Sequence, residues 1–307
     1  MNIVFFGSDD FALAHLEALL SSQHNVVGCV TQPDRPKNRG MKVVVSPIKE
    51  CALTNDIDVF QPDDLSDPDF VSSLKKINAE LFVVIAYGKF LTAELIDLTE
   101  YGAINVHGSL LPKYRGAAPI NWVIINGETE TGVTIIKLNT KMDAGDILSS
   151  EKIKILEDDT SISLREKMKD CGKSLLLDTL GGLKKGSLQV RSQDQNEASF
   201  ASKLTKELGK IDWNKSAKEI NDLIRGLQPW PGVYTFFNGK SLKILSAQIV
   251  DVSALPGQVV EISSEGIVVA AKEGGLLVKQ VHLQDAKAMD ITSFLRGHSV
   301  EIGFTFE

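Results

Sequence analysis

The stretch AINVHGSLLPKYRGAAP, residues 103–119, carries the features that decide the fold. It begins with a short apolar run in which Asn105 is the one polar residue, and it continues into a turn-rich segment that starts with His107 and Gly108. Such a run, bounded by glycine, is typical of a buried strand in an open α/β sheet, where ligands bind beyond the carboxyl ends of strands. Asn105 and His107 are two positions apart, so an extended strand points both side chains to the same side. An amide can donate to an oxyanion and an imidazole can move a proton, so the pair predicts a reactive centre; a satisfied polar pair at a strand end is the alternative.

Strand and helix patterns alternate before this stretch. Strands are predicted at residues 2–6, 26–31, 58–61 and 81–87, and helices at residues 11–20, from 47 onward, at 66–77 and at 92–98. This alternation predicts βαβ units and a parallel sheet. The first turn, GSDDFA, lacks the G-x-G-x-x-G spacing, so no dinucleotide site is predicted.

A carboxylate candidate follows the stretch. Strand patterns at residues 131–138 and 147–155 flank the acidic turn KMDAGD, which contains Asp143. If the neighbouring strand ends meet, this carboxylate could orient the His107 ring and stabilise its imidazolium form. The alternative is that Asp143 only forms the turn.

The C-terminal third has a different pattern. A polar stretch at residues 186–209 is followed by a helix whose first turn carries a capping box of Ser216 and Glu219. Its apolar face consists of Ile220, Leu223, Ile224 and Leu227. From Val233 onward, five or six short strand patterns alternate with glycine turns, which predicts a small β-barrel, with the oligonucleotide-binding type as one option.

Composition narrows the class of protein. The chain of 307 residues is long for one core, and its 43% hydrophobic and 24% charged residues are ordinary for a globular protein. No apolar run approaches the roughly 20 residues that span a bilayer, and the N-terminus enters a strand pattern directly, so a cytoplasmic protein without a membrane segment is expected. The three cysteines show no metal spacing and no histidine has a partner at ligand spacing, so reduced thiols and no metal are expected.

Two basic segments interrupt an acidic chain of formal charge −7. The stretch 32–47 carries four basic residues and three prolines with one glycine, which predicts a long loop without a helix. It could contact a polyanion, or it could be solvated charge on a surface loop. The polar stretch 186–209 and the lysine just beyond it could be a tether or a second basic strip facing the site.

Seven collinear segments together resemble one family. They are GSDDFA, TQPDRP, NVHGSLLPKYRGAAP, ETGVTI, MDAGD, GKIDW and PWPG. The chain is similar to the methionyl-tRNA formyltransferases, within the folate-dependent formyltransferases, over essentially its whole length. The resemblance implies a Rossmann-like domain with helices on both faces of its sheet at residues 1–188, a basic linker at 189–206, and a barrel-like tRNA-binding domain at 207–307.

The resemblance also implies an activity and a set of site residues. The donor would be 10-formyltetrahydrofolate and the acceptor would be methionyl initiator tRNA, with no metal. The catalytic residues of the family match Asn105, His107 and Asp143, and its folate-binding segment matches Ser109, Leu110, Leu111 and Pro112. Its tRNA-binding residues match Arg39 and Lys42 in the loop and, approximately, Lys203, Lys206 and Lys210. Phe11 matches an aromatic of the methionine pocket, although a core phenylalanine fits this position as well.

Two other functions remain open. A formyltransferase that acts on a nucleotide-linked amino sugar shares HGSLLPKYRG, ETGVT and the acidic turn, whereas GAAP after Arg115 and the intact TQPDRPKNRG loop favour the tRNA acceptor. A non-catalytic RNA-binding protein on the same scaffold would bind tRNA without transferring a formyl group. A monomer is expected.

Overall fold

The computed structural model describes residues 1–37 and 42–307, which form two compact units. The first consists of residues 1–116, 130–154 and 165–200, and the second of residues 117–129, 155–164 and 201–307.

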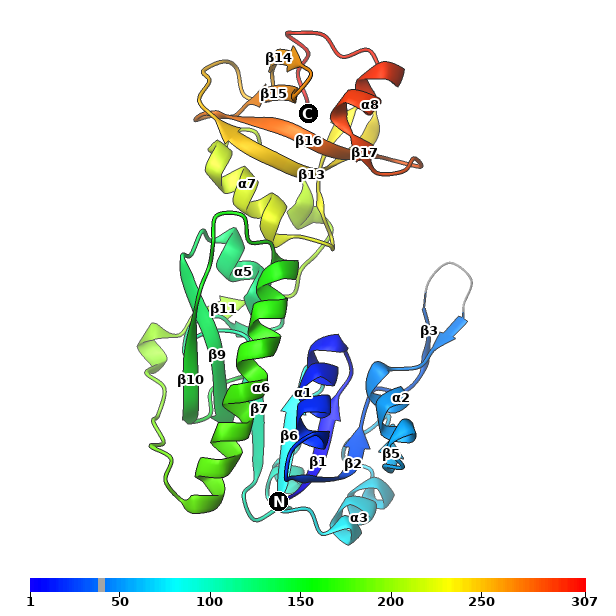
Figure 1. Cartoon of the computed structure of the whole chain (residues 1–307), viewed down its shortest axis with the longest axis vertical. Helices are drawn as coiled ribbons and strands as arrows, with labels where there is room; N and C mark the ends of the chain where they lie inside the picture. The colour runs from blue at the N-terminus through cyan, green and yellow to red at the C-terminus, as the bar shows by residue number, and fades with distance from the viewer. Residues whose placement is uncertain (38–41) are drawn as a thin grey trace. The chain divides into compact units, whose positions relative to one another are not determined.

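The strands before residue 200 are β1 (Asn2–Gly7), β2 (Asn25–Val30), β3 (Arg35–Lys37), β4 (Lys42–Val44), β5 (Val59–Phe60), β6 (Leu81–Ile85), β7 (Ala103–His107), β8 (Arg115–Gly116), β9 (Glu130–Lys137) and β10 (Ile147–Lys154). The helices of this part are α1 (Asp10–Leu20), α2 (Pro47–Thr54), α3 (Pro68–Ile77), α4 (Ala93–Ile96), α5 (Pro119–Ile125), α6 (Ser161–Lys185) and the 3₁₀ helix η1 (Gln195–Glu197) (Figure 1).

The first unit is built on a seven-stranded sheet in the order β10-β9-β7-β6-β1-β2-β5. The strands β5, β2, β1, β6 and β7 are parallel, and β9 and β10 are antiparallel to their neighbours. From β1 the chain moves outward to β2 and β5, and then returns to place β6 on the other side of β1. The order therefore reverses between β1 and β6, and a ligand crevice is expected at the carboxyl ends of these strands.

Alternate residues of β1 face opposite layers of helices. Val4 and Phe6 are buried in one core cluster with Phe70 of α3 and Leu95 of α4. The other face is covered by α1, against which α6 packs so closely that a Cβ atom on Gly172 would lie 2.5 Å from His15 Nε2. The open, mostly parallel sheet covered on both faces confirms the predicted fold class.

Side chains cap the starts of the first two helices. The side chain of Asp9 accepts from the backbone of α1, and Ser46 does the same for α2, where Pro47 is the first helical residue. The stretch 32–47 differs from its prediction, because β3 and β4 pair as an antiparallel hairpin instead of forming a loop throughout.

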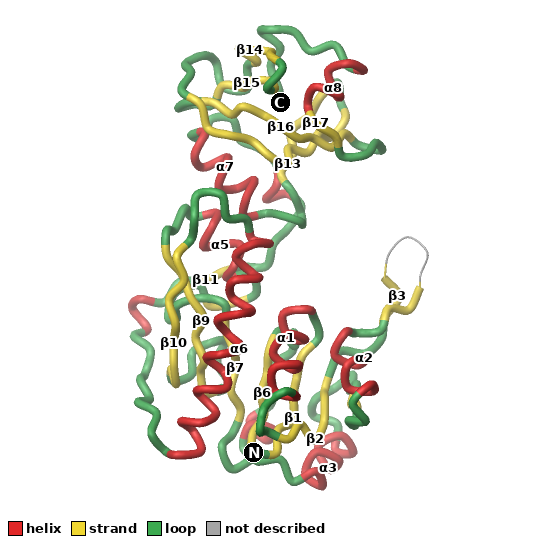
Figure 2. The backbone as a smooth tube through the Cα atoms, in the orientation of Figure 1, coloured by secondary structure: helices red, strands yellow, loops and turns green. Residues whose placement is uncertain are grey.

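The second unit contains an antiparallel sheet of six strands, consistent with the predicted small barrel domain. This unit includes α5. Its elements after residue 201 are η2 (Glu207–Gly209), α7 (Ala217–Gly226), β12 (Val233–Phe237), β13 (Lys240–Val250), β14 (Val259–Ser263), β15 (Gly266–Ala270), β16 (Gly275–Leu283), β17 (Met289–Asp290) and α8 (Ile291–Gly297). The remaining short strand of the chain is β11 (Phe200–Ala201). The order is β12-β13-β16-β15-β14, with β17 paired to β16 (Figure 2). The capping box of Ser216 and Glu219 is present, and Ile220 and Ile224 bury the predicted apolar face of α7.

Candidate active site

The candidate site lies at the carboxyl edge of the parallel sheet. His107 is the last residue of β7, which pairs with β6 next to the point where the strand order reverses. The loops after β1, β2 and β6 meet at the same edge, where Ser8 Oγ and Gln32 Nε2 both donate to the carbonyl oxygen of Tyr87 at 3.4 and 2.9 Å. The fold therefore places the predicted reactive strand at the position where open α/β sheets bind ligands.

The His107 imidazole is buried, with both nitrogens facing protein groups. Nε2 lies 2.8 Å from the carbonyl oxygen of Tyr114, and because a carbonyl oxygen only accepts, Nε2 carries a proton. Nδ1 lies 3.7 Å from Oδ2 of Asp143. Nδ1 is therefore the ring nitrogen that is left to take up or release a proton, and it faces the carboxylate of Asp143.

The connection between β9 and β10 brings Asp143 to His107. The β7–β9 register pairs Lys137, the last residue of β9, with Ile104 near the start of β7, so the two strand ends are not neighbours. Residues 138–146 lead from the end of β9 back to His107 at the end of β7. Within this connection, Asp143 adopts a left-handed backbone conformation with φ of 46°. Its Oδ2 accepts the backbone N–H of Gly116 at 2.8 Å, which holds the carboxylate beside the ring.

Asn105 completes the cluster from the same strand. Its Nδ2 donates weakly to Asp143 Oδ1, at 3.5 Å, and the side chain is half-buried. Its second N–H group has no protein partner among residues 1–37 and 42–307. A primary amide with a free donor beside a carboxylate and an imidazole can stabilise charge that develops on a carbonyl oxygen.

The segment Ser109–Pro112 is folded tightly behind His107. Ser109 is fully buried, and its hydroxyl donates to the carbonyl oxygen of Lys113 at 2.6 Å. The Thr134 hydroxyl of β9 accepts from the backbone of Leu111 at 3.1 Å and donates to the carbonyl oxygen of Ser109 at 2.6 Å. Leu111 is buried with Ile136 and Ile147, whereas Leu110 and Pro112 are half-buried. The hydroxyl and the carbonyl group of Ser109 are thus used within the protein.

Phe11 lies in α1, beneath a cation. Its side chain is only 4% exposed, its ring lies 4.8 Å from the ring of His15, and the guanidinium of Arg165 covers it at 5.2 Å. Asp9 and Asp10 hold Arg165 in ion pairs. Phe11 is therefore packed as a core residue in this structure, and contact with a ligand would require Arg165 to move.

The predicted tRNA-binding residues fall in both units. Arg39 lies outside the described residues, and Lys42 opens β4, with nothing described of its side chain. Lys203, Lys206 and Lys210 are exposed on the second unit, and the Lys210 ammonium lies 5.6 Å from the centre of the Phe236 ring.

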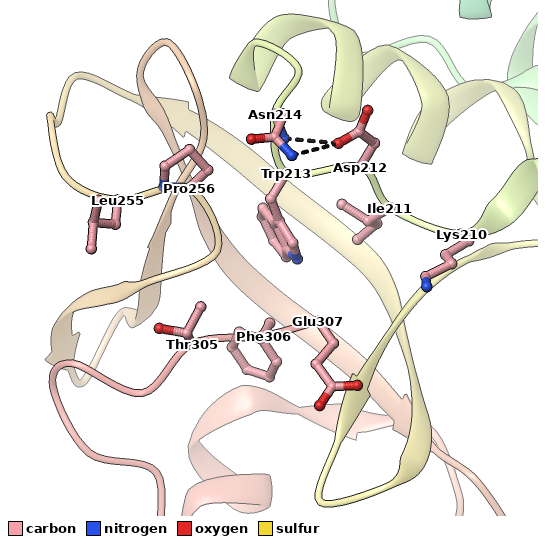
Figure 3. A pocket seen from close by; sticks show the side chains of 10 residues that line it. All are labelled: Lys210, Ile211, Asp212, Trp213, Asn214, Leu255, Pro256, Thr305, Phe306 and Glu307. Atoms are coloured by element: carbon pink, nitrogen blue, oxygen red, sulfur yellow. Dashed lines mark hydrogen bonds between the residues drawn. The ribbon is translucent and has the colours of Figure 1, made fainter.

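A separate pocket of about 620 Å³ lies within the second unit (Figure 3). Trp213 and Phe306 form its apolar wall as a stacked pair, with ring centres 6.3 Å apart, and Lys210 is part of its lining. The indole N–H of Trp213 donates to Thr235 Oγ1 at 3.3 Å, so this group is used within the fold.

No cluster of three metal-ligating side chains occurs in the part of the chain that the structure describes. No helix within residues 1–37 and 42–307 is long and apolar enough to cross a bilayer.

Sequence reasoning missed four residues around the cluster. Tyr114 and Gly116 act through backbone groups, which leave no side-chain signal. Arg115 is almost completely buried, although an arginine in a turn-rich segment is usually solvated. Gln193 lies in the polar stretch 186–209, where nothing in the sequence distinguishes it from a tether residue.

Comparison with known proteins defines the class. Residues 1–180 match the family described as formyl transferase, and residues 203–299 match the formyl transferase C-terminal domain. The chain belongs to the formyl transferase family. The methionyl-tRNA formyltransferase of Caldanaerobacter subterraneus subsp. tengcongensis is 45% identical over 306 residues, which cover 99% of each chain. That of Clostridium tetani is 42% identical over 310 residues, which cover the whole of each chain.

Solved structures share the fold at lower identity. The N-formyltransferase from Helicobacter canadensis, in complex with folinic acid and dTDP-3-aminofucose, superimposes with a TM-score of 0.67 at 19% identity, covering 94% of this chain and 99% of the other. HypX from Aquifex aeolicus, in complex with tetrahydrofolic acid, gives 0.67 at 16% identity, covering 98% of this chain and 50% of that protein. At these identities the likeness concerns the fold alone.

Proposed function

We propose that the protein transfers the formyl group of 10-formyltetrahydrofolate to the α-amino group of methionyl initiator tRNA. The observation that carries the reaction type is the meeting of Asn105, His107 and Asp143 at the carboxyl edge of the sheet. Full-length identity of 40–45% to methionyl-tRNA formyltransferases supports the choice of acceptor.

The residues present suit a formyl donor. The formyl carbonyl needs a hydrogen-bond donor, and Asn105 presents an N–H group that is not used within the described residues. The reaction joins the amino nitrogen to the formyl carbon, breaks the bond from that carbon to the folate nitrogen, and moves one proton from the amine to the folate nitrogen. The chain must therefore stabilise charge on the formyl oxygen and accept and return one proton.

Asn105 donates to the formyl oxygen as negative charge develops there. A donor of this kind is worth about 3 kcal/mol in acyl transfer. The pair of His107 Nδ1 and Asp143 accepts the proton of the attacking amine and returns it to the leaving nitrogen. Because Tyr114 fixes the proton on Nε2, this exchange takes place at Nδ1, on the side that faces Asp143.

Substrate binding would draw on both units. The segment Ser109–Pro112 would form part of the folate site through its backbone and its two half-buried side chains. Arg39, Lys42, Lys203, Lys206 and Lys210 would hold the phosphates of the acceptor, and Phe11 would line a methionine pocket once Arg165 is displaced. The boundaries at residues 188 and 206, the monomeric state and the cytoplasmic location stay predictions.

A competition between acceptors tests this function. Purified protein is incubated with 10-formyltetrahydrofolate and either methionyl initiator tRNA or a nucleotide-linked amino sugar, and each product is identified by mass spectrometry. Formylmethionyl-tRNA is the expected product. Formylation of the amino sugar alone would replace this function, and tRNA binding without any formyl transfer would identify a binding protein on the same scaffold.

A further inference from the structure

Gln193 connects a buried arginine to the turn that carries Asp143. Its Oε1 accepts from Arg115 Nε at 3.1 Å and from Arg115 Nη2 at 2.6 Å. Its Nε2 donates to the carbonyl oxygen of Asp143 at 2.8 Å and to that of Gly145 at 2.6 Å. The guanidinium only donates and the carbonyls only accept, so the orientation of the amide is fixed by its partners. All four hydrogen-bonding positions of this amide are occupied.

The segment that supplies Gln193 is attached to both sides of the cluster. After α6, residues 186–199 run as a loop beside β10, with η1 as their one helical turn (Figure 2). Arg191 exchanges two backbone hydrogen bonds with Ile147, of 2.7 and 3.0 Å. Further along, Ser199 accepts the backbone N–H groups of Tyr114 and Arg115, each at 2.9 Å. This part of the predicted linker is therefore built into the first unit, and only 7% of Gln193 is exposed.

The turn that contains Asp143 depends on contacts from other segments to keep its conformation. Asp143 has a φ of 46°, in the left-handed region that residues with a side chain rarely adopt. Such a conformation persists only when surrounding contacts determine it. Gln193 binds the carbonyl of this residue and of the residue two positions later, so it holds the turn on both sides of Ala144.

Arg115 adds an electrostatic reason for this arrangement. Its guanidinium is buried, and within residues 1–37 and 42–307 its partners are the amides of Gln193 and Gln195 instead of a carboxylate. A cation that binds the oxygen of an amide polarises that amide and strengthens the bonds its N–H groups donate. The charge of Arg115 thus acts on the Asp143 turn through Gln193.

We propose that Gln193 is a positioning residue for the proposed catalytic carboxylate of Asp143, which it holds at the distance and angle that His107 requires. This inference depends on the role of Asp143 in the proposed function. It assigns the segment 191–199 to the active site, although that segment lies between the two regions that match the family.

Two substitutions of Gln193 test the proposal. The loss of the two N–H donors is the only change that they have in common, so an effect seen in both is assigned to those donors. Gln193→Glu keeps the acceptor for Arg115 but adds a negative charge, whereas Gln193→Met adds no charge but leaves Arg115 with fewer partners. A misplacement of about 1 Å at a reacting group can cost on the order of a hundredfold in rate. Both variants should lower kcat by about 10- to 100-fold, with the KM for folate and for charged tRNA near their parent values. Gln195→Met is the matched control, since Gln195 binds Arg115 at 2.9 Å but does not contact the turn, and its loss of kcat should be clearly smaller.

A double-mutant cycle separates positioning from general structural damage. If Gln193 acts through Asp143, Gln193→Glu should change kcat little in an Asp143→Asn background, because the group it positions is already disabled. Additive losses, or a parent-like kcat in both single Gln193 variants, would overturn the proposal. If Asp143→Asn alone keeps the parent kcat, the proposed role of Asp143 fails, which is a result distinct from failure of the Gln193 proposal.

Discussion

Gly116 and Asp143 are joined by a hydrogen bond of 2.8 Å from the backbone N–H of the glycine to the carboxylate of the aspartate. The two residues belong to segments separated by α5 and β9, and the bond holds the carboxylate 3.7 Å from the His107 ring. Gln193 donates to the backbone carbonyl oxygen of the same aspartate at 2.8 Å. Asp143 is thus held through its side chain by Gly116 and through its backbone by Gln193, which is the arrangement expected for a preorganised catalytic group.

Asp143→Asn should remove most turnover while leaving substrate binding in place. Asparagine has nearly the same shape and can still accept from Gly116, but it cannot stabilise an imidazolium at His107 by charge. We expect kcat to fall on the order of a hundredfold, with both KM values close to those of the parent enzyme. Steady-state kinetics with both substrates measure this.

Asp146→Asn is the control for that experiment, because Asp146 belongs to the same connection and its side chain is exposed. It removes one charge without touching the cluster, so its kcat should remain near the parent value. A normal kcat in Asp143→Asn would exclude this carboxylate from the mechanism.

Gly145→Ala should disturb the same site through the backbone. A Cβ atom on Gly145 would lie 1.7 Å from the carbonyl oxygen of Lys137, which is far inside contact distance, so the turn must shift and carry Asp143 with it. We expect kcat to fall at least about tenfold, together with a lower midpoint of thermal unfolding.

Gly181→Ala is the matched substitution, because a Cβ atom at this helical position meets nothing within 4 Å. Alanine is favoured over glycine inside a helix by about 1 kcal/mol, so this variant should be as stable as the parent or more stable. If the two alanine variants have the same kcat and the same midpoint of thermal unfolding, the Asp143 turn tolerates displacement.

Charge removal at the predicted tRNA contacts should weaken acceptor binding in a salt-dependent way. Combined alanine substitution of Lys203, Lys206 and Lys210 should raise the KM for methionyl tRNA and reduce the dependence of log KM on log salt, by up to roughly 0.7–0.9 for each phosphate that these lysines neutralise. The KM for folate should not change. Arg39→Ala should have the same kind of effect.

The corresponding control is alanine substitution of Lys184 and Lys185, which are exposed at the end of α6 and were not predicted to contact tRNA. An unchanged KM and an unchanged salt slope in the triple lysine variant would remove these residues from the acceptor site. The same result for Arg39→Ala would remove the basic loop.

His15 should make the folded state sensitive to mild acid. Burial lowers the pKa of this histidine to about 4, with a contribution from Lys173, whereas the backbone bond to Phe11 and the charge of Asp9 act in the opposite direction. The unfolded chain therefore takes up a proton below about pH 6.5 that the folded protein does not accept. The stability that depends on neutral His15 is fully present above pH 6.5 and is lost between pH 6.5 and 4, by up to about 3 kcal/mol.

Urea unfolding of the parent and of His15→Leu between pH 8 and pH 4 measures this contribution. Leucine does not titrate, so the free energy of unfolding of the variant should fall less steeply over this interval. Parallel curves for the two proteins would show that His15 titrates alike in the folded and unfolded chains.

The sequence predicted best those features that depend on interactions between residues close together in the chain. Alternating strand and helix patterns predicted the sheet, Ser216 and Glu219 predicted the start of α7, and the two-residue spacing of Asn105 and His107 predicted two side chains on one side of a strand. Each of these depends on local periodicity, capping or hydrogen bonding, which the order of residues determines directly.

The tertiary structure decided what depends on contacts between distant segments. The antiparallel register of β9 separates its end from that of β7, so residues 138–146 must fold back before Asp143 can meet His107. Gln193 reads as a solvated residue in a polar stretch, and it becomes part of the site only because the chain after α6 returns along β10. Strand register and the path of a loop are set by packing over the whole unit, so a local sequence pattern does not predict them.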